Sequence, residues 1–168
     1  MLYRLAAGLL LFHLVLPVWA QSLQTDSDWA RTGAEAEHRA LPVVILVTDH
    51  NCGFCERMRH EFLLTPQTRT LLEDGAVTRE FQRNSGGKVT DFDGERVRTR
   101  IFLSRYNIFA TPTLLILDPS GKPLAQALVG YNNAQSYAHM VSQRLEQART
   151  LLGANRQTTQ NALARADR

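Results

Sequence analysis

The sequence predicts an α/β fold, in which helices cover both faces of a central sheet. Residues 42–48 form a continuous apolar run rich in β-branched side chains, and a strand that is apolar on both sides is expected to be buried on both faces. A helical pattern begins at Gly53, directly after the polar turn that follows this strand. Residues 113–117 form a second apolar strand later in the chain.

Helical and extended segments alternate around these strands. Asp26-Ser27-Asp28 can cap a helix that ends at Leu41-Pro42, and Thr65-Pro66 divides the helix that begins at Gly53 from a second helical piece. Asp118-Pro119-Ser120-Gly121 fits a type I turn and predicts a hairpin. The other expected elements are a strand at 76–82 parallel to 42–48, a loop or small hairpin at 83–97, a short helix at 98–106, a strand at 124–129 and a helix from 133 onward.

The N-terminal residues 1–20 are typical of a secretory signal peptide. Arg4 supplies the positive start, an apolar run follows it, and Val18-Trp19-Ala20 offers the small residues of a cleavage site. An uncleaved membrane anchor is the alternative, although the apolar run is shorter than the roughly 18–20 residues of a spanning helix. Either way, the rest of the chain is expected in an extracytoplasmic compartment, periplasmic or similar, where disulfides persist.

The remaining sequence predicts one domain at 21–148 and a polar C-terminal tail at 149–168, expected as a frayed helix or a disordered segment. The formal charge of the chain is +3, and its arginines are dispersed along the sequence. No dense block of lysine and arginine with interleaved aromatic residues occurs, which argues against nucleic acid as a partner.

Cys52 and Cys55 are the only cysteines of the chain, so any sulfur chemistry occurs there. A disulfide between them would close a very short loop and would stabilise the fold little. A structural zinc site needs four ligands, and the histidines at 38, 50, 60 and 139 do not supply the usual spacing. The pair therefore predicts thiol–disulfide exchange, without a metal or another cofactor.

The order of these elements resembles the thioredoxin fold, a central mixed four-stranded sheet flanked by helices, over residues 28–148. Two motifs carry the resemblance: Cys52-Gly53-Phe54-Cys55 after the buried strand, and Thr111-Pro112-Thr113 before the hairpin. The chain is also similar to small exported thioredoxin-like proteins of the SoxW type. The matching positions there are Asp28-Trp29, Met58, Glu61 and Gly130-Tyr131.

The positions of the cysteines predict separate roles for them. A helix N-terminus lowers the pKa of a thiol, which makes Cys52 the expected nucleophile and Cys55, one turn into the helix, the expected resolving thiol. The resemblance implies that Pro112 is a cis proline lying against the pair and that the backbone of Thr111 contacts the substrate. An ordinary trans turn before the strand is the alternative for Pro112.

Two positions depart from thioredoxin itself. Asn51 stands where a tryptophan usually precedes the first cysteine, and Leu46 stands where a buried acid assists proton transfer from the resolving thiol. Asp49, His50 and Glu56 are the nearby candidates for proton transfer or for tuning the thiol pKa; a water is the alternative. The Gly-Phe pair between the cysteines does not indicate a redox potential.

The resemblance implies an exported thiol–disulfide oxidoreductase that reduces protein disulfides and receives electrons from a membrane thiol–disulfide transporter. Its partners would be proteins that contain disulfides or thiols. The same pair could instead serve a thiol oxidase or a disulfide isomerase, although no added dimerisation domain is visible. A non-catalytic binding module with the same fold is the alternative from another functional class.

Overall fold

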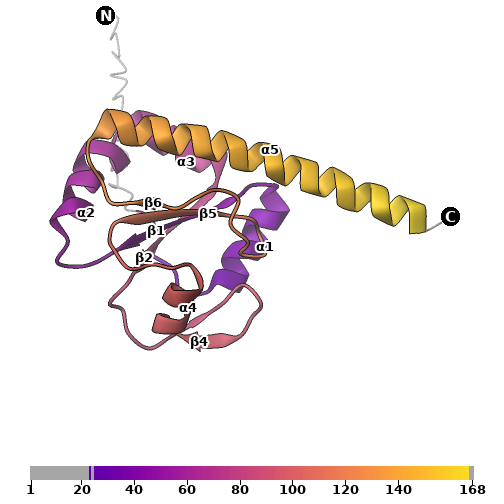
Figure 1. The fold of residues 1–168 in the computed structure, drawn as a ribbon, viewed down its shortest axis with the longest axis horizontal. Coiled ribbons are helices and arrows are strands. Elements are labelled where there is room, and N and C mark those ends of the chain that lie inside the picture. Colours follow the sequence, from indigo (N-terminus) through magenta and orange to yellow (C-terminus); the bar gives the residue numbers. More distant parts are fainter. Residues whose placement is uncertain (1–22, 24, 167–168) are drawn as a thin grey trace, which may run out of the picture.

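A four-stranded mixed sheet with the strand order β2-β1-β5-β6 forms the centre of the domain (Figure 1). The central strand β1, Val43–Thr48, is parallel to β2, Val77–Gln82, and antiparallel to β5, Thr113–Leu117. The short strand β6, Leu128–Val129, extends the sheet beyond β5. The expected α/β architecture, a central mixed sheet flanked by helices, is therefore confirmed.

The computed structural model describes residues 23 and 25–166. The expected signal peptide at 1–20 lies outside the described residues. Within the described part of the chain, none of the helices combines the length and the apolar character that a membrane crossing requires.

The sheet separates two hydrophobic clusters, and β1 contributes to both. Every residue of β1 is buried, and successive side chains of a strand point to opposite faces. Val44 and Leu46 pack on the face covered by α2, α3 and α5, whereas Val43, Ile45 and Val47 pack on the face covered by α1 and α4. The bounds of the covering helices are Gly53–Met58 for α2, Pro66–Gly75 for α3, Ala134–Ala166 for α5, Trp29–Arg39 for α1 and Thr99–Arg105 for α4.

Trp29 anchors the second cluster. Its side chain is fully buried, its ring stacks on Phe102 with a centroid distance of 5.4 Å, and it meets Phe81 edge to face at 5.5 Å. Asp28 caps the helix that begins at Trp29, because its Oδ1 accepts a hydrogen bond from the Arg31 N–H at 3.0 Å. The cap is at the position that the sequence predicts, and it fixes where α1 begins and so directs Trp29 into the core.

The segment between α2 and β5 follows the expected order with local differences. After Met58, the helix continues in π-helical form as η1, Arg59–Leu63, before Thr65 caps α3. The expected loop or small hairpin at 83–97 is a hairpin of β3, Lys88–Thr90, and β4, Arg96–Arg98. The short helix expected at 98–106 is α4, on which Phe102 is buried whereas Ile101 is 42% exposed.

The strand expected at 124–129 is shorter than predicted. Pro123 forms an isolated bridge with Leu117, and the Leu124 N–H donates to the Ile116 carbonyl at 2.9 Å, but regular pairing resumes only at Leu128. The register of the Leu114–Leu128 pair is shifted by two residues from that of the Leu117–Pro123 bridge, so residues 125–127 bulge out of the regular ladder.

The segment from 149 onward, expected as a frayed helix or a disordered segment, is neither frayed nor disordered up to Ala166, because α5 continues as a regular helix to that residue. Leu152 is buried in the first cluster, and Arg156 donates to the Glu37 carbonyl at 3.2 Å. After Arg156, helix propensity maintains α5, because the segment is rich in the strong helix formers alanine, leucine, glutamine and arginine. Figure 1 shows the end of α5 projecting past the sheet.

Replacing Trp29 with alanine should lower the free energy of unfolding by about 3 to 5 kcal/mol, because it removes the largest buried ring of the second cluster. The measurement is urea denaturation followed by circular dichroism. Leu163→Ala is the control, since Leu163 is 62% exposed on α5 and its loss should change the free energy by no more than about 0.5 kcal/mol. Equal losses in the two variants would contradict this account of the core.

Candidate active site

Cys52 and Cys55 form a disulfide at the start of α2, just after the carboxyl end of β1. Cys52 is the N-cap of α2: its backbone is extended, and its Sγ accepts a hydrogen bond from the Cys55 N–H at 3.1 Å. The two sulfurs differ in accessibility, because Cys52 is half-buried whereas Cys55 is only 1% exposed. A partner in solution therefore reaches Cys52 first.

The segment before β5 faces this pair. The carbonyl oxygen of Thr111 lies 3.5 Å from the Cys52 Sγ, and the peptide bond between Thr111 and Pro112 is cis. Pro112 is buried, and its carbonyl accepts a hydrogen bond from the Gly130 N–H at 2.8 Å. The fold thus brings together the cysteines, the Thr-Pro segment and the glycine that follows β6.

Tyr131 fixes the segment after β6 against the helix that carries the cysteines. Its hydroxyl donates to Glu61 Oε2 at 2.9 Å, and its ring is buried against Tyr137. Burial, together with the hydrogen bond to Glu61, raises the pKa of Tyr131 to about 12. The phenol therefore remains protonated and keeps donating its hydrogen bond throughout the neutral range.

The three side chains predicted to tune the thiol pKa, those of Asp49, His50 and Glu56, have different partners in the structure. Asp49 pairs with Arg83 at 3.2 Å and accepts a hydrogen bond from the Asn84 amide at 2.7 Å. Glu56 is exposed and lies 3.9 Å from His60 on the next turn. His50 is exposed in the turn before Cys52. In the described part of the chain, no hydrogen bond joins any of the three side chains to a cysteine sulfur.

The structure adds a buried acid, Glu80, that the sequence did not single out. Glu80 lies on β2 in register with Leu46 and is 3% exposed. Its carboxylate accepts hydrogen bonds from Thr48 Oγ1 at 2.7 Å and from Arg59 at 2.8 Å. Hydrogen bonding to Glu80 raises the pKa of Arg59 above its ordinary value. Because Arg59 follows Cys55 by one helical turn, this ion pair joins the cysteine helix to the sheet.

The sequence could not distinguish Glu80 from a surface residue. In β2, polar residues alternate with Val77 and Phe81, the pattern of a strand with one face in water. The polar face of β2 instead lies beneath the segment around Arg59, whose guanidinium compensates the buried charge. Only the arrangement of the helix over the sheet reveals this burial.

The model of the thioredoxin-like domain family matches residues 30–145. The chain belongs to the thioredoxin-like domain family. No curated protein sequence matches it at a significant level.

Three solved structures show the extent of the shared fold. DsbH oxidoreductase is 18% identical with a TM-score of 0.57, and the match covers 84% of this chain and 95% of DsbH. A thioredoxin from Thermus thermophilus is 18% identical with a TM-score of 0.55, covering 73% of this chain and 87% of that one. The C-terminal domain of DsbD from Neisseria meningitidis is 17% identical with a TM-score of 0.52, covering 68% and 90%.

In this thioredoxin-like domain, strand β2 supplies a buried acid, Glu80, next to Leu46 of β1. Leu46 and Glu80 are paired across β1 and β2, so both side chains lie on the face beneath the cysteine helix. The carboxylate accepts two hydrogen bonds from Arg59 and one from Thr48, and Gln82 adds a fourth at 3.0 Å. The hydrogen bonds between Arg59 and Glu80 therefore attach the cysteine helix to β2.

Glu80→Gln should lower the free energy of unfolding by about 2 to 3 kcal/mol, because the half-buried Arg59 would lose its counter-charge and an amide N–H₂ would face other donors. Urea denaturation measures the change. Glu56→Gln is the matched control: it removes an exposed pair and should cost no more than about 0.5 kcal/mol. If both variants unfold at the same urea concentration as the wild type, Glu80 does not anchor the helix.

Proposed function

We propose that this protein is an exported thiol–disulfide oxidoreductase that reduces disulfides in other proteins with the Cys52–Cys55 pair. One observation carries the proposal: the disulfide lies at a helix N-terminus with one accessible and one buried sulfur, against the Thr111 carbonyl. This geometry suits two successive exchange reactions with different attacking sulfurs. DsbH, which has the same fold, is described as an oxidoreductase.

The reaction begins with the reduced pair. The Cys55 N–H points at the Cys52 sulfur, and the helix N-terminus favours negative charge there, so Cys52 is the thiolate nucleophile. It attacks one sulfur of the substrate disulfide and forms a mixed disulfide, while the other substrate sulfur leaves as a thiolate. Cys55 then loses its proton and attacks the Cys52 sulfur. The second substrate sulfur leaves, and the protein is left with the Cys52–Cys55 disulfide.

The overall reaction transfers two electrons to the substrate, whose two sulfurs finish as protonated thiols. To act again, the protein needs a two-electron donor, for which we propose a membrane thiol–disulfide transporter. Proteins with disulfides or thiols are the proposed substrates. The leader-like residues 1–20 support an extracytoplasmic location, either free after cleavage or held at the membrane by this segment.

The residues around the pair have proposed roles in the same reaction. Thr111 and Pro112 form the platform on which the substrate backbone lies, because the Thr111 carbonyl is adjacent to the Cys52 sulfur that forms the mixed disulfide. His50, Asp49 and Glu56 are proposed to tune the thiol pKa or to transfer the proton of Cys55. The SoxW-type placement within the thioredoxin-like family is proposed on the motifs around Trp29, Met58 and Tyr131.

The direction of the reaction is tested by the equilibrium of the pair against a glutathione or dithiothreitol series. A reductant should have a potential near about −270 mV, close to that of thioredoxin. Acid quenching, thiol alkylation and mass spectrometry measure the reduced fraction. A potential near about −120 mV would instead assign the pair to thiol oxidation.

Cys55→Ser should accumulate mixed disulfides with substrate proteins through Cys52, because the resolving sulfur is absent. Non-reducing electrophoresis of alkylated samples detects these complexes, and reductant should dissolve them. Cys52→Ser is the control and should trap little, since Cys55 is buried. Trapping by Cys52→Ser alone would reverse the assigned roles, and trapping by neither variant would favour a non-catalytic binding module.

A further inference from the structure

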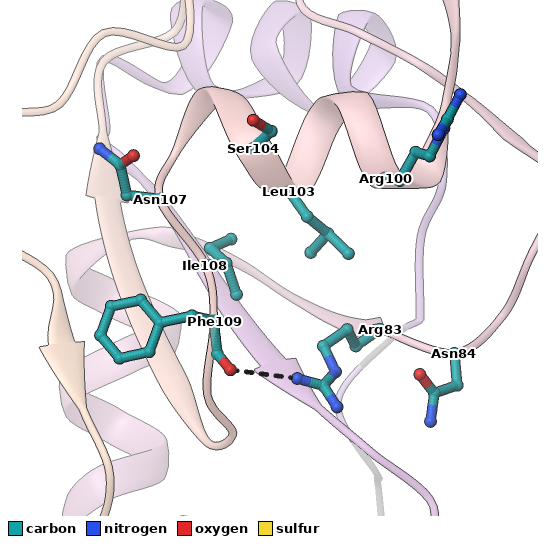
Figure 2. Close-up of a pocket in the computed structure, with 8 residues that line it drawn as sticks. All are labelled: Arg83, Asn84, Arg100, Leu103, Ser104, Asn107, Ile108 and Phe109. Carbon is teal, nitrogen blue, oxygen red and sulfur yellow. Dashed lines mark hydrogen bonds between the residues drawn. The ribbon is translucent and has the colours of Figure 1, made fainter.

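A pocket of about 540 Å³ lies beside the candidate active site, between α4, the end of β2 and the segment that leads to Thr111 (Figure 2). Two connections place it there. Phe109, which lines the pocket, precedes Thr111 by two residues, and Arg83, which also lines it, pairs with Asp49 in the turn before Cys52. A polypeptide bound at the cysteines therefore lies within a few residues of the pocket.

The walls of the pocket combine positive charge with apolar surface. Figure 2 shows Leu103 and Ile108 directed into the hollow and the Arg83 guanidinium at its lower edge, where it donates to the Phe109 carbonyl at 3.3 Å. The Phe109 ring points away from Arg83 and is 76% exposed. Aromatic side chains, phenylalanine among them, are enriched in protein–protein interfaces relative to the rest of the surface, so this ring can contact a bound peptide.

Arg100 supplies the free charge of the pocket. Asp49 already neutralises Arg83, but Arg100 is exposed and pairs with no acidic side chain within residues 25–166. Its position at the start of α4 places it directly after strand β4. The charge of this wall therefore continues onto the β3–β4 hairpin.

The hairpin gathers basic residues that are separated in the sequence. Lys88 and Arg98 are direct cross-strand partners, an arrangement that repels and costs stability. Arg96 lies two residues before Arg98 and is also exposed. Two of the three acidic residues of the hairpin turn, Asp91 and Asp93, face Arg105. The third, Glu95, is exposed and directly precedes Arg96, so a single carboxylate stands beside this group of basic residues. We call this set the basic patch: Lys88, Arg96, Arg98 and Arg100.

From this arrangement we infer that the pocket and the basic patch bind an acidic segment of the protein that exchanges disulfides at Cys52. The inference rests on the proposed function and names its substrate class. An extended chain rises by about 3.3 Å per residue, so a carboxylate roughly two to five residues from the substrate cysteine would reach the pocket. The apolar wall selects a polypeptide over other polyanions, because a peptide also supplies side chains for Leu103, Ile108 and Phe109.

Two labelled twelve-residue peptides test binding alone. They carry serine in place of the substrate cysteine and therefore cannot exchange disulfides. One has aspartate and glutamate at the neighbouring positions, and the other has asparagine and glutamine. The full chain in its disulfide form should bind the acidic peptide about tenfold more tightly at low salt, and added salt should reduce this preference. Fluorescence anisotropy gives both dissociation constants.

The double variant Arg98→Glu/Arg100→Glu should abolish the preference, so that the ratio of the two dissociation constants falls to about one. Both side chains are exposed, so the circular dichroism spectrum should not change. The double variant Arg149→Glu/Arg165→Glu, at two exposed positions of α5, changes the net charge by the same amount and should leave the preference intact. Equal binding of the two peptides by the wild type, or an equal loss in the control, would overturn the inference.

Two further measurements separate this inference from the proposed function. Cysteine forms of the same peptides, linked as disulfides, report exchange with the reduced protein. Exchange without an acidic preference would overturn the inference and leave the proposed function standing. An acidic preference in binding without exchange would overturn the proposed function; the acidic-peptide site would stand, but not its assignment to a substrate of Cys52. Tighter binding of anionic lipid vesicles or of single-stranded RNA than of the acidic peptide, lost in the double variant, would also overturn the inference.

Discussion

The burial of β1 on both faces is the constraint on which the rest of the structure depends. A strand without a polar face needs a packing layer on each side, and the two hydrophobic clusters supply these layers. Its neighbours are then fixed in register: Thr48 pairs with Gln82 on β2, and Val47 pairs with Thr113 on β5. The residues that follow β1, those that follow β2 and those that precede β5 therefore lie at the same end of the sheet.

The candidate active site and the pocket both lie at this end of the sheet. The residues after β1 include Cys52 and Asp49, those after β2 begin with Arg83, and those before β5 are the Phe109–Pro112 segment. Arg83 links all three, since it pairs with Asp49 and donates to the Phe109 carbonyl. The antiparallel direction of β5 is essential here, because it brings the start of that strand, and with it Pro112, to the carboxyl end of β1.

The parts predicted from the sequence are those with a strong local pattern. The apolar run of β1, the cysteine spacing with the helix that follows it, and Thr111-Pro112 before a second apolar run were enough to predict the fold and the cysteine pair. The continuation of α5 was missed because its inward apolar stripe ends, whereas helix propensity alone maintains the last turns.

Residues that depend on distant pairing were not predictable in this way. Glu80 is part of an alternating polar pattern that also fits a solvated strand, and only the position of Arg59 above it explains its burial. The basic residues between 83 and 100 look dispersed in the sequence, but the β3–β4 register places Lys88 opposite Arg98. Arg96, Arg98 and Arg100 are close in the sequence, but the contribution of Lys88 to the cluster comes from the pairing.

Selectivity must come from the surface around the cysteines, because thiol–disulfide exchange requires only an accessible sulfur and a suitable thiolate. The pair itself cannot distinguish one protein disulfide from another. Cross-strand repulsion between Lys88 and Arg98 costs stability, and two of the three acids of the adjoining turn, Asp91 and Asp93, face Arg105 instead. An acidic partner would relieve that repulsion when it binds with its cysteine near Cys52. The charge arrangement that costs stability in the free protein would therefore contribute favourably to the free energy of binding.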